Sequence, residues 1–171
     1  MSKTKLKKYL LSLTKEQVVD IMLELHSASK EANSWLEFYM EPSCKAELEK
    51  YKKAIRSQFY GRNDYPKDPS FRECNKLVTA FKKLVPDPNV IADLMLYYVE
   101  QGCSLTAQFG DYEEPFYTAL ENNFNKAVKF IAENGLMSEL APRIKKMIES
   151  VEYCGYGFPD TLWNMYYEYA D

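Results

Sequence analysis

The side chains of this chain that are best placed to do chemistry are carboxylates inside an apolar stretch. Asp93 and Glu100 are seven residues apart, and Tyr97 lies between them. Seven residues make about two helical turns, so a helix places all three side chains on one face. In so apolar a helix the carboxylates need partners. Acid–base catalysis is one interpretation. A structural bond to Lys, Arg or Tyr is favoured, because ion-pair networks mimic catalytic sites.

A second acidic cluster precedes the next apolar stripe. Asp111, Glu113 and Glu114 lie just before Tyr117 in the sequence. An Asp followed three residues later by a Glu resembles a capping box, and a helix N-terminus favours acidic side chains. We therefore predict that Asp111 caps a helix. If the chain binds a small ligand instead, the candidates for its pocket are Asp93, Glu100, Asp111 and Tyr117.

Aromatic residues are abundant, with 14 Tyr, nine Phe and two Trp. Most of them fall on predicted core stripes, but tyrosine is also enriched in binding interfaces. The candidates for exposure are Tyr60, Tyr65, Tyr153, Tyr156, Phe158 and Tyr167. The predicted ligand or partner surface consists of Asp93, Tyr97, Glu100, Asp111, Tyr117, Tyr156 and Phe158.

The residue patterns that several kinds of catalytic or metal site require are missing from the sequence. The sequence contains no Gly-rich phosphate loop, and a Ser/His/Asp or Cys/His site has to use His26, which lies in an apolar helical setting that favours a structural role. The cysteines form no C-x-x-C pair, which favours buried thiols over a zinc site. They are Cys44, Cys74, Cys103 and Cys154. The sequence therefore predicts no catalytic residue, metal or cofactor, and it favours a protein that is not an enzyme without settling the question.

Two consecutive helices must position the candidate residues. Asp87-Pro88 is a helix start signal, and we interpret Gly102 as the stop of that helix. The run from Leu94 to Val99 has almost no polar face, which is typical of a buried helix. The second helix is expected to run from Asp111 to Gly135.

Apolar residues recur at helical spacing in the rest of the chain as well, and no segment alternates with a period of two. Thr14 and Ser70 head predicted capping boxes, Ser43 is a predicted cap, and Pro42 is a predicted helix end. In the first three helices the residues expected to face inward are Leu6, Tyr9, Leu10, Leu13, Val18, Ile21, Met22, Leu25, Ala32, Trp35, Leu36 and Tyr39.

The sequence thus predicts an all-α protein of eight or nine helices stacked as antiparallel pairs. A short α-solenoid of the HEAT or TPR kind is one form of this arrangement. The triplet Glu100-Gln101-Gly102 recurs as Glu133-Asn134-Gly135, offset by 33 residues, which suits a helical-pair repeat.

Charge is divided unevenly within what we expect to be one domain over residues 1–171. Residues 1–85 hold 17 Lys and Arg against 11 Asp and Glu, a net charge of +6. Residues 86–171 hold five against 14, a net charge of −9. The chain has no run of ~20 apolar residues that could cross a bilayer, and no secretory signal. These features predict a cytoplasmic protein without a membrane partner.

Three stretches of the sequence resemble those of a known protein family. KLKKYLLSLTKEQVVDIMLEL, DLMLYYVEQG and FGDYEEPFYTAL together resemble an uncharacterised family of small bacterial proteins, catalogued only as a domain of unknown function. The resemblance implies an all-helical bacterial protein. It implies no catalytic residue, substrate or cofactor.

The biochemical function is not specified by these features, and three hypotheses follow. The first is a non-enzymatic helical module that binds a protein or a second copy of itself. The second is a nucleic-acid-binding protein that uses the basic half, which the pI of about 5.4 argues against. The third is an enzyme or small-ligand binder with a site between the central helices. The candidate phosphate contacts of the second hypothesis are Lys3, Lys5, Lys7, Lys8, Lys52, Lys53, Arg56, Lys82 and Lys83.

Overall fold

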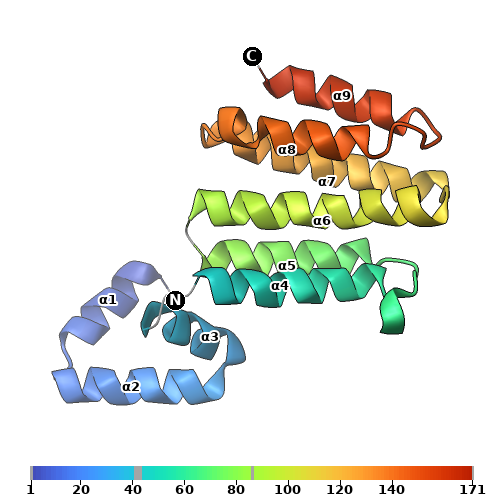
Figure 1. Cartoon of the computed structure of the whole chain (residues 1–171). Helices are drawn as coiled ribbons and strands as arrows, with labels where there is room; N and C mark the ends of the chain where they lie inside the picture. The colour runs from blue at the N-terminus through green and yellow to red at the C-terminus, as the bar shows by residue number, and fades with distance from the viewer. Residues whose placement is uncertain (1, 41–43, 86, 171) are drawn as a thin grey trace. The chain divides into compact units, whose positions relative to one another are not determined.

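A computed structural model describes residues 2–40, 44–85 and 87–170 and shows an all-helical chain (Figure 1). Within these ranges it holds nine α-helices and one short 3-10 helix. The described residues form no β-strand, and Tyr60 and Pro66 make an isolated bridge. The all-α prediction is therefore confirmed. Contacts between residues divide the chain into two compact units, residues 1–43 and 44–171.

The N-terminal unit consists of three short helices. They are α1 (Lys3–Leu11), α2 (Lys15–Ala28) and α3 (Lys30–Met40). The predicted capping box at the start of α2 is present, because Thr14 accepts a hydrogen bond from the Gln17 N–H and the Gln17 side chain accepts one from the Thr14 N–H. The predicted helix end at Pro42 and the predicted cap at Ser43 lie outside the described residues.

The predicted inward faces of these three helices are only partly right. The structure leaves no described side chain of this unit buried. The predicted inward residues that it exposes are Leu6, Tyr9, Met22, Leu25, Trp35 and Tyr39. Three short helices have too little surface to enclose a core of their own, since chains of about 40 residues fall below the size at which burial supports folding.

The second unit is a stack of three antiparallel helical pairs (Figure 1). The helices are α4 (Cys44–Phe59), α5 (Phe71–Leu84), α6 (Pro88–Phe109), α7 (Glu114–Glu133), α8 (Met137–Glu149) and α9 (Phe158–Tyr169), and the 3-10 helix η1 (Arg62–Asp64) follows α4. Each pair shares contacts, α6 also contacts α4 and α8, and α7 contacts α9. The three loops that join partners within pairs lie along one edge, at the right in Figure 1.

The central helix α6 is longer than the sequence pattern indicated. It begins after Asp87, which caps it as predicted, but it passes through Gly102 and ends at Phe109, where Gly110 takes a φ of 94°. The interpretation of Gly102 as a stop is therefore wrong. A Cβ atom at this position would lie 2.3 Å from Leu120 Cδ2 of α7, so the glycine serves close helix packing.

The 33-residue echo does not correspond to a structural repeat. Gly102 lies inside α6, whereas Gly135 follows α7 with a φ of 68° and ends that helix as predicted. The helical pairs begin instead at Cys44, Pro88 and Met137, which are further apart than 33 residues. The glycines that end the two triplets thus have different structural roles, close helix packing at Gly102 and a helix end at Gly135.

Helix α7 starts later than predicted. Its N-cap is Glu113, which makes no side-chain capping bond, and Pro115 lies in the first turn. The capping role predicted for Asp111 is therefore wrong. Its carboxylate is engaged elsewhere, by the hydroxyl of Tyr117 and the backbone N–H of Gly155.

Candidate functional site

The predicted surface residues fall into two separate groups in the second unit. The first group is a four-residue ion-pair cluster that joins three helices. Arg143 of α8 donates to Glu100 through Nε at 2.6 Å and through Nη2 at 2.8 Å, and to Asp93 through Nη1 at 2.5 Å. Lys52 of α4 donates to the other oxygen of Asp93 at 2.8 Å. Both carboxylates of α6 are therefore fully engaged.

The electrostatics of the cluster favour the charged forms of Asp93 and Arg143. Burial opposes ionisation of Asp93, but the hydrogen bonds from Lys52 and Arg143 outweigh it and hold the pKa of that carboxyl below its usual value. Burial also disfavours the guanidinium of Arg143, yet its bonds to Glu100 and Asp93 raise its pKa. A general acid or base needs a pKa near the working pH, which these groups do not have.

Tyr97 belongs to the edge of the same cluster. The Lys52 ammonium lies 5.3 Å from the centre of its ring, within the range of a cation–π contact. Asp93 and Glu100 thus have the cationic partners that the structural interpretation requires, Lys52 and Arg143. The sequence did not single out these partners, because Lys52 is 41 residues from Asp93 and Arg143 is 43 residues from Glu100.

The second group is a chain of hydrogen bonds that joins two loops. The hydroxyl of Tyr117 donates to Asp111 Oδ1 at 2.6 Å, and Thr106 Oγ1 lies 2.7 Å from the same hydroxyl. Cys154 Sγ lies 3.7 Å from Thr106 Oγ1, and the N–H of Gly155 donates to Asp111. Thr106 and Cys154 were not predicted. This chain fastens the loop before α7 to the loop before α9.

The pKa values in this group follow from its hydrogen bonds. The Tyr117 hydroxyl and the Gly155 N–H lower the pKa of Asp111, and burial together with the Asp111 bond raises the pKa of Tyr117 to about 12. Burial also raises the pKa of the Cys154 thiol. None of these groups is an activated nucleophile, because a reactive cysteine needs a lowered pKa.

Aromatic rings extend from this group to the surface. The ring of Tyr117 packs against those of Tyr156 and Phe158, with centres 5.4 and 4.9 Å apart. Phe158 is fully buried, so its predicted exposure is wrong, and Tyr60 is buried as well. Both rings are needed to fill space at the helix ends. Tyr65, Tyr153, Tyr156 and Tyr167 are exposed as predicted.

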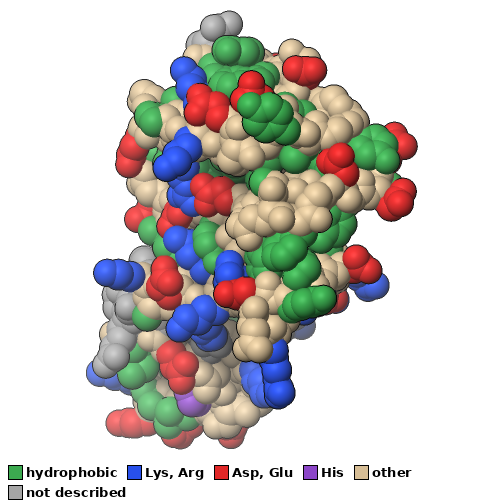
Figure 2. Space-filling model, turned by 45° about the vertical axis from the view of Figure 1, so that its right-hand side comes forward, with side chains coloured by type: hydrophobic (Ala, Val, Ile, Leu, Met, Phe, Trp, Pro, Cys, Tyr) green, Lys and Arg blue, Asp and Glu red, His purple; other side chains and the backbone are tan. Residues whose placement is uncertain are grey.

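The exposed side chains of these two loops form what we call the loop surface. It consists of Phe109, Asp111, Glu113, Glu152, Tyr153 and Tyr156. Tyr153 is 95% exposed, Tyr156 59% and Phe109 48%. Residues 109–113 and 152–157 contain no Lys or Arg. Figure 2, which turns the loop edge toward the viewer, shows hydrophobic and acidic side chains next to one another.

One cavity lies beside the ion-pair cluster, and another lies beside α4. One, of about 490 Å³, lies between α6 and α8 and is lined by Glu100, Arg143, Cys103 and Lys146 among others. Burial raises the pKa of the Cys103 thiol, which disfavours a reactive thiolate, and Glu100 and Arg143 are paired with each other.

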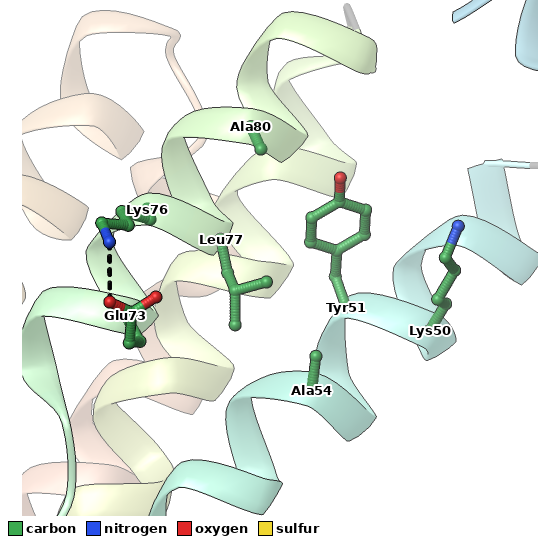
Figure 3. A pocket seen from close by; sticks show the side chains of 7 residues that line it. All are labelled: Lys50, Tyr51, Ala54, Glu73, Lys76, Leu77 and Ala80. Atoms are coloured by element: carbon green, nitrogen blue, oxygen red, sulfur yellow. Dashed lines mark hydrogen bonds and ion pairs between the residues drawn. The ribbon is translucent and has the colours of Figure 1, made fainter. Parts of the chain in front are cut away.

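The other cavity lies between α4 and α5 and has a volume of about 310 Å³ (Figure 3). Ala54, Leu77 and Ala80 give it an apolar lining. Its two lysines are paired along their own helices, Lys76 with Glu73 at 2.7 Å and Lys50 with Glu47 at 3.4 Å. Among the described residues, each charged side chain that lines this cavity has an ion-pair partner.

In the part of the chain that the structure describes, no group of three or more His, Cys, Asp or Glu side chains is arranged to hold a metal ion. Among the described helices, none combines the length and the apolar character that crossing a bilayer requires. Cys74 and Cys103 are buried, as expected for structural thiols, and Cys154 is partly buried.

The structure defines the class of this protein, and a family model defines its family. Its fold is that of an all-helical protein built on stacked helical pairs. The chain belongs to a family of unknown function, DUF6155, whose model matches residues 1–153. No curated protein and no solved structure matches it. A bacterial source, which the resemblance implied, stays a prediction.

Proposed function

We infer that this chain is a non-enzymatic module that binds a protein partner through the loop surface. The observation that carries the proposal is the high exposure of Tyr153, Tyr156 and Phe109 beside three carboxylates, in two loop segments whose own sequences contain no Lys or Arg. Monomeric proteins expose single apolar residues routinely, whereas grouped aromatic residues with one sign of charge are typical of interaction sites.

The chemistry of the loop surface also indicates the kind of partner. Arg and Lys side chains stack on tyrosine rings and pair with carboxylates. A basic segment therefore suits this surface, supplied by another protein or by the basic half of a second copy. The hydrogen-bond chain from Asp111 to Cys154 supports the proposal, because it holds the two loops in one arrangement and so reduces the entropy lost on binding.

The test is site-specific photo-crosslinking from position 153 in the full chain, in the native host, with light scattering on the purified protein. We expect a discrete crosslinked product, either with one partner or with a second copy. Glu152→Lys together with Tyr156→Ala should abolish it, because the double variant keeps the crosslinker at position 153 but removes an exposed ring of the loop surface and reverses a charge.

The matched control is Tyr167→Ala. Tyr167 is 60% exposed but lies on α9, away from the loop surface. Its variant should crosslink as the parent protein does. A protein that stays monomeric and yields no product from position 153 would contradict the proposal, and so would equal loss of product in the Tyr167 variant.

Two of the remaining expectations stay proposals. The cytoplasmic location is supported by three reduced cysteines among the described residues, two of them buried. Nucleic-acid binding by the basic half loses some of its candidate contacts, because Lys52 pairs with Asp93 and Arg56 donates to Gln101 and Asp64. We therefore keep it as the less favoured alternative.

A further inference from the structure

A groove of about 450 Å³ runs between α5 and α7 and has α6 as part of its floor. One wall is a single stripe of α5, at helical spacing, and the other is a single stripe of α7. The lining from α5 is Asn75, Val78, Thr79 and Lys82, that from α7 is Asn123, Lys126, Lys129, Phe130 and Glu133, and Met95 and Tyr98 come from α6. Neither group of candidate residues described above includes these side chains.

The rim of the groove is basic although the surrounding half of the chain is acidic. Residues 86–171 contain only five Lys and Arg, and two of these, Lys126 and Lys129, line the groove. Lys82 adds a third cation from the opposite wall. One carboxylate, Glu133, lies nearby and is 3.9 Å from Lys129. The groove therefore has an excess of positive charge.

The cations are placed near one another and against apolar surface. The Lys82 ammonium lies 4.4 Å from the centre of the Phe130 ring. Burial lowers the pKa of Lys82, the nearby charge of Lys126 lowers it further, and Glu133 raises it. Like charges three residues apart on a helix, as Lys126 and Lys129 are, also repel slightly. A bound anion would relieve this repulsion.

The floor of the groove holds a polar group with unused capacity. Asn123 is 6% exposed, and its Nδ2 donates to the carbonyl of Ala119 at 2.7 Å and to the hydroxyl of Tyr98 at 3.3 Å. A carbonyl oxygen can only accept, so the bond to Ala119 fixes the orientation of the amide. In the described part of the chain, no hydrogen bond reaches Asn123 Oδ1. A ligand with an N–H or O–H group could supply one.

We propose that the groove between α5 and α7 binds a small organic anion, a carboxylate or a phosphate on an apolar body that also carries a hydrogen-bond donor. Lys82, Lys126 and Lys129 hold the anionic group. Val78, Met95 and Phe130 contact the apolar body, and Asn123 accepts from the donor. The volume of about 450 Å³ lies within the usual range of small-molecule sites. This binding is independent of the loop surface.

The test is calorimetric titration of the full chain with four compounds at low salt. Phenyl phosphate and inorganic phosphate form one pair, and 4-aminobenzoate and benzoate form the other. We expect phenyl phosphate to bind at least fivefold more tightly than inorganic phosphate if the source of the anion is a phosphate. If it is a carboxylate, 4-aminobenzoate should bind and benzoate should bind more weakly, because benzoate lacks the donor.

Matched variants separate the groove from general surface charge. Lys82→Gln with Lys126→Gln should weaken binding by about tenfold, as the loss of two partly exposed charge contacts implies. Lys83→Gln should leave binding unchanged, because Lys83 is the exposed neighbour of Lys82 and does not line the groove. If neither phenyl phosphate nor 4-aminobenzoate binds, the proposal is wrong. Equal weakening by Lys83→Gln also overturns it. So does the absence of a preference in both pairs, with inorganic phosphate binding as tightly as phenyl phosphate and benzoate as tightly as 4-aminobenzoate.

Discussion

The close contact at Gly102 makes a sharp prediction about the packing of the two central helices. A Cβ atom there would lie 2.3, 2.8 and 3.0 Å from Cδ2, Cδ1 and Cγ of Leu120. Leu120 is completely buried, so its side chain has little room to move aside. Gly102→Ala must therefore force α6 and α7 apart or push Leu120 into a strained rotamer.

Two opposing terms set the size of the effect. Replacing a helical glycine by alanine stabilises a helix by about 1 kcal/mol. Overpacking a core costs about 1–3 kcal/mol, and three contacts at or below 3.0 Å place this site at the upper end. We expect Gly102→Ala to lower the free energy of unfolding by about 1–2 kcal/mol, measured by urea denaturation followed by far-UV circular dichroism.

A double-mutant cycle with Leu120→Ala tests the cause. Leu120→Ala alone leaves a cavity and should cost about 3 kcal/mol. Combined with Gly102→Ala it should cost less than the sum by at least about 1 kcal/mol, since the added methyl group enters the vacated space. If Gly102→Ala is stabilising, or if the two changes are additive, close packing against Leu120 is not the reason for the glycine.

Three further predictions concern the two polar groups. Arg143→Met should lower the free energy of unfolding by about 2–4 kcal/mol in urea melts, because it leaves Asp93 and Glu100 without their shared cation; a change below about 0.5 kcal/mol would mean that the cluster is only a surface feature. The pKa of Asp93 is lower in the folded state than in the unfolded state, where it is about 4. The resulting stability is present above the unfolded pKa and is lost as pH falls through the folded pKa. Asp93→Asn should therefore flatten the acid limb of a stability–pH curve, and an unchanged acid limb would refute this. Asp111→Ala should lower the melting temperature more than Asp111→Asn, and Tyr117→Phe should remove most of that difference. A difference of full size in the Tyr117→Phe background would refute the role of the Tyr117 bond and leave the Gly155 N–H as the partner that matters.

Local sequence signals determined most of the helical architecture. Helical periodicity and the absence of period-two alternation predicted an all-α chain, and caps such as Thr14 and Asp87 are where the sequence placed them. Such signals are reliable because an N-cap bond involves residues two or three positions apart and depends little on the rest of the fold. The apolar run in α6 likewise predicted its burial, since a helix without a polar face has no side to turn to water.

The candidate residues were found in part, because chemistry at close range is visible in sequence and partners at long range are not. The requirement that Asp93 and Glu100 find cations followed from burial alone. That Arg143 supplies three of the four hydrogen bonds depended on α8 packing beside α6.

Asp111 and Gly102 show how tertiary contacts override local signals. Asp111 has the residue type and spacing of a cap, yet Tyr117 and Gly155 compete for its carboxylate. Gly102 has the type of a helix stop, yet its lack of a side chain is used by Leu120 of the neighbouring helix. In both cases several local choices were close in free energy, and the packing of the helical pairs, which involves residues far apart in the chain, decided between them.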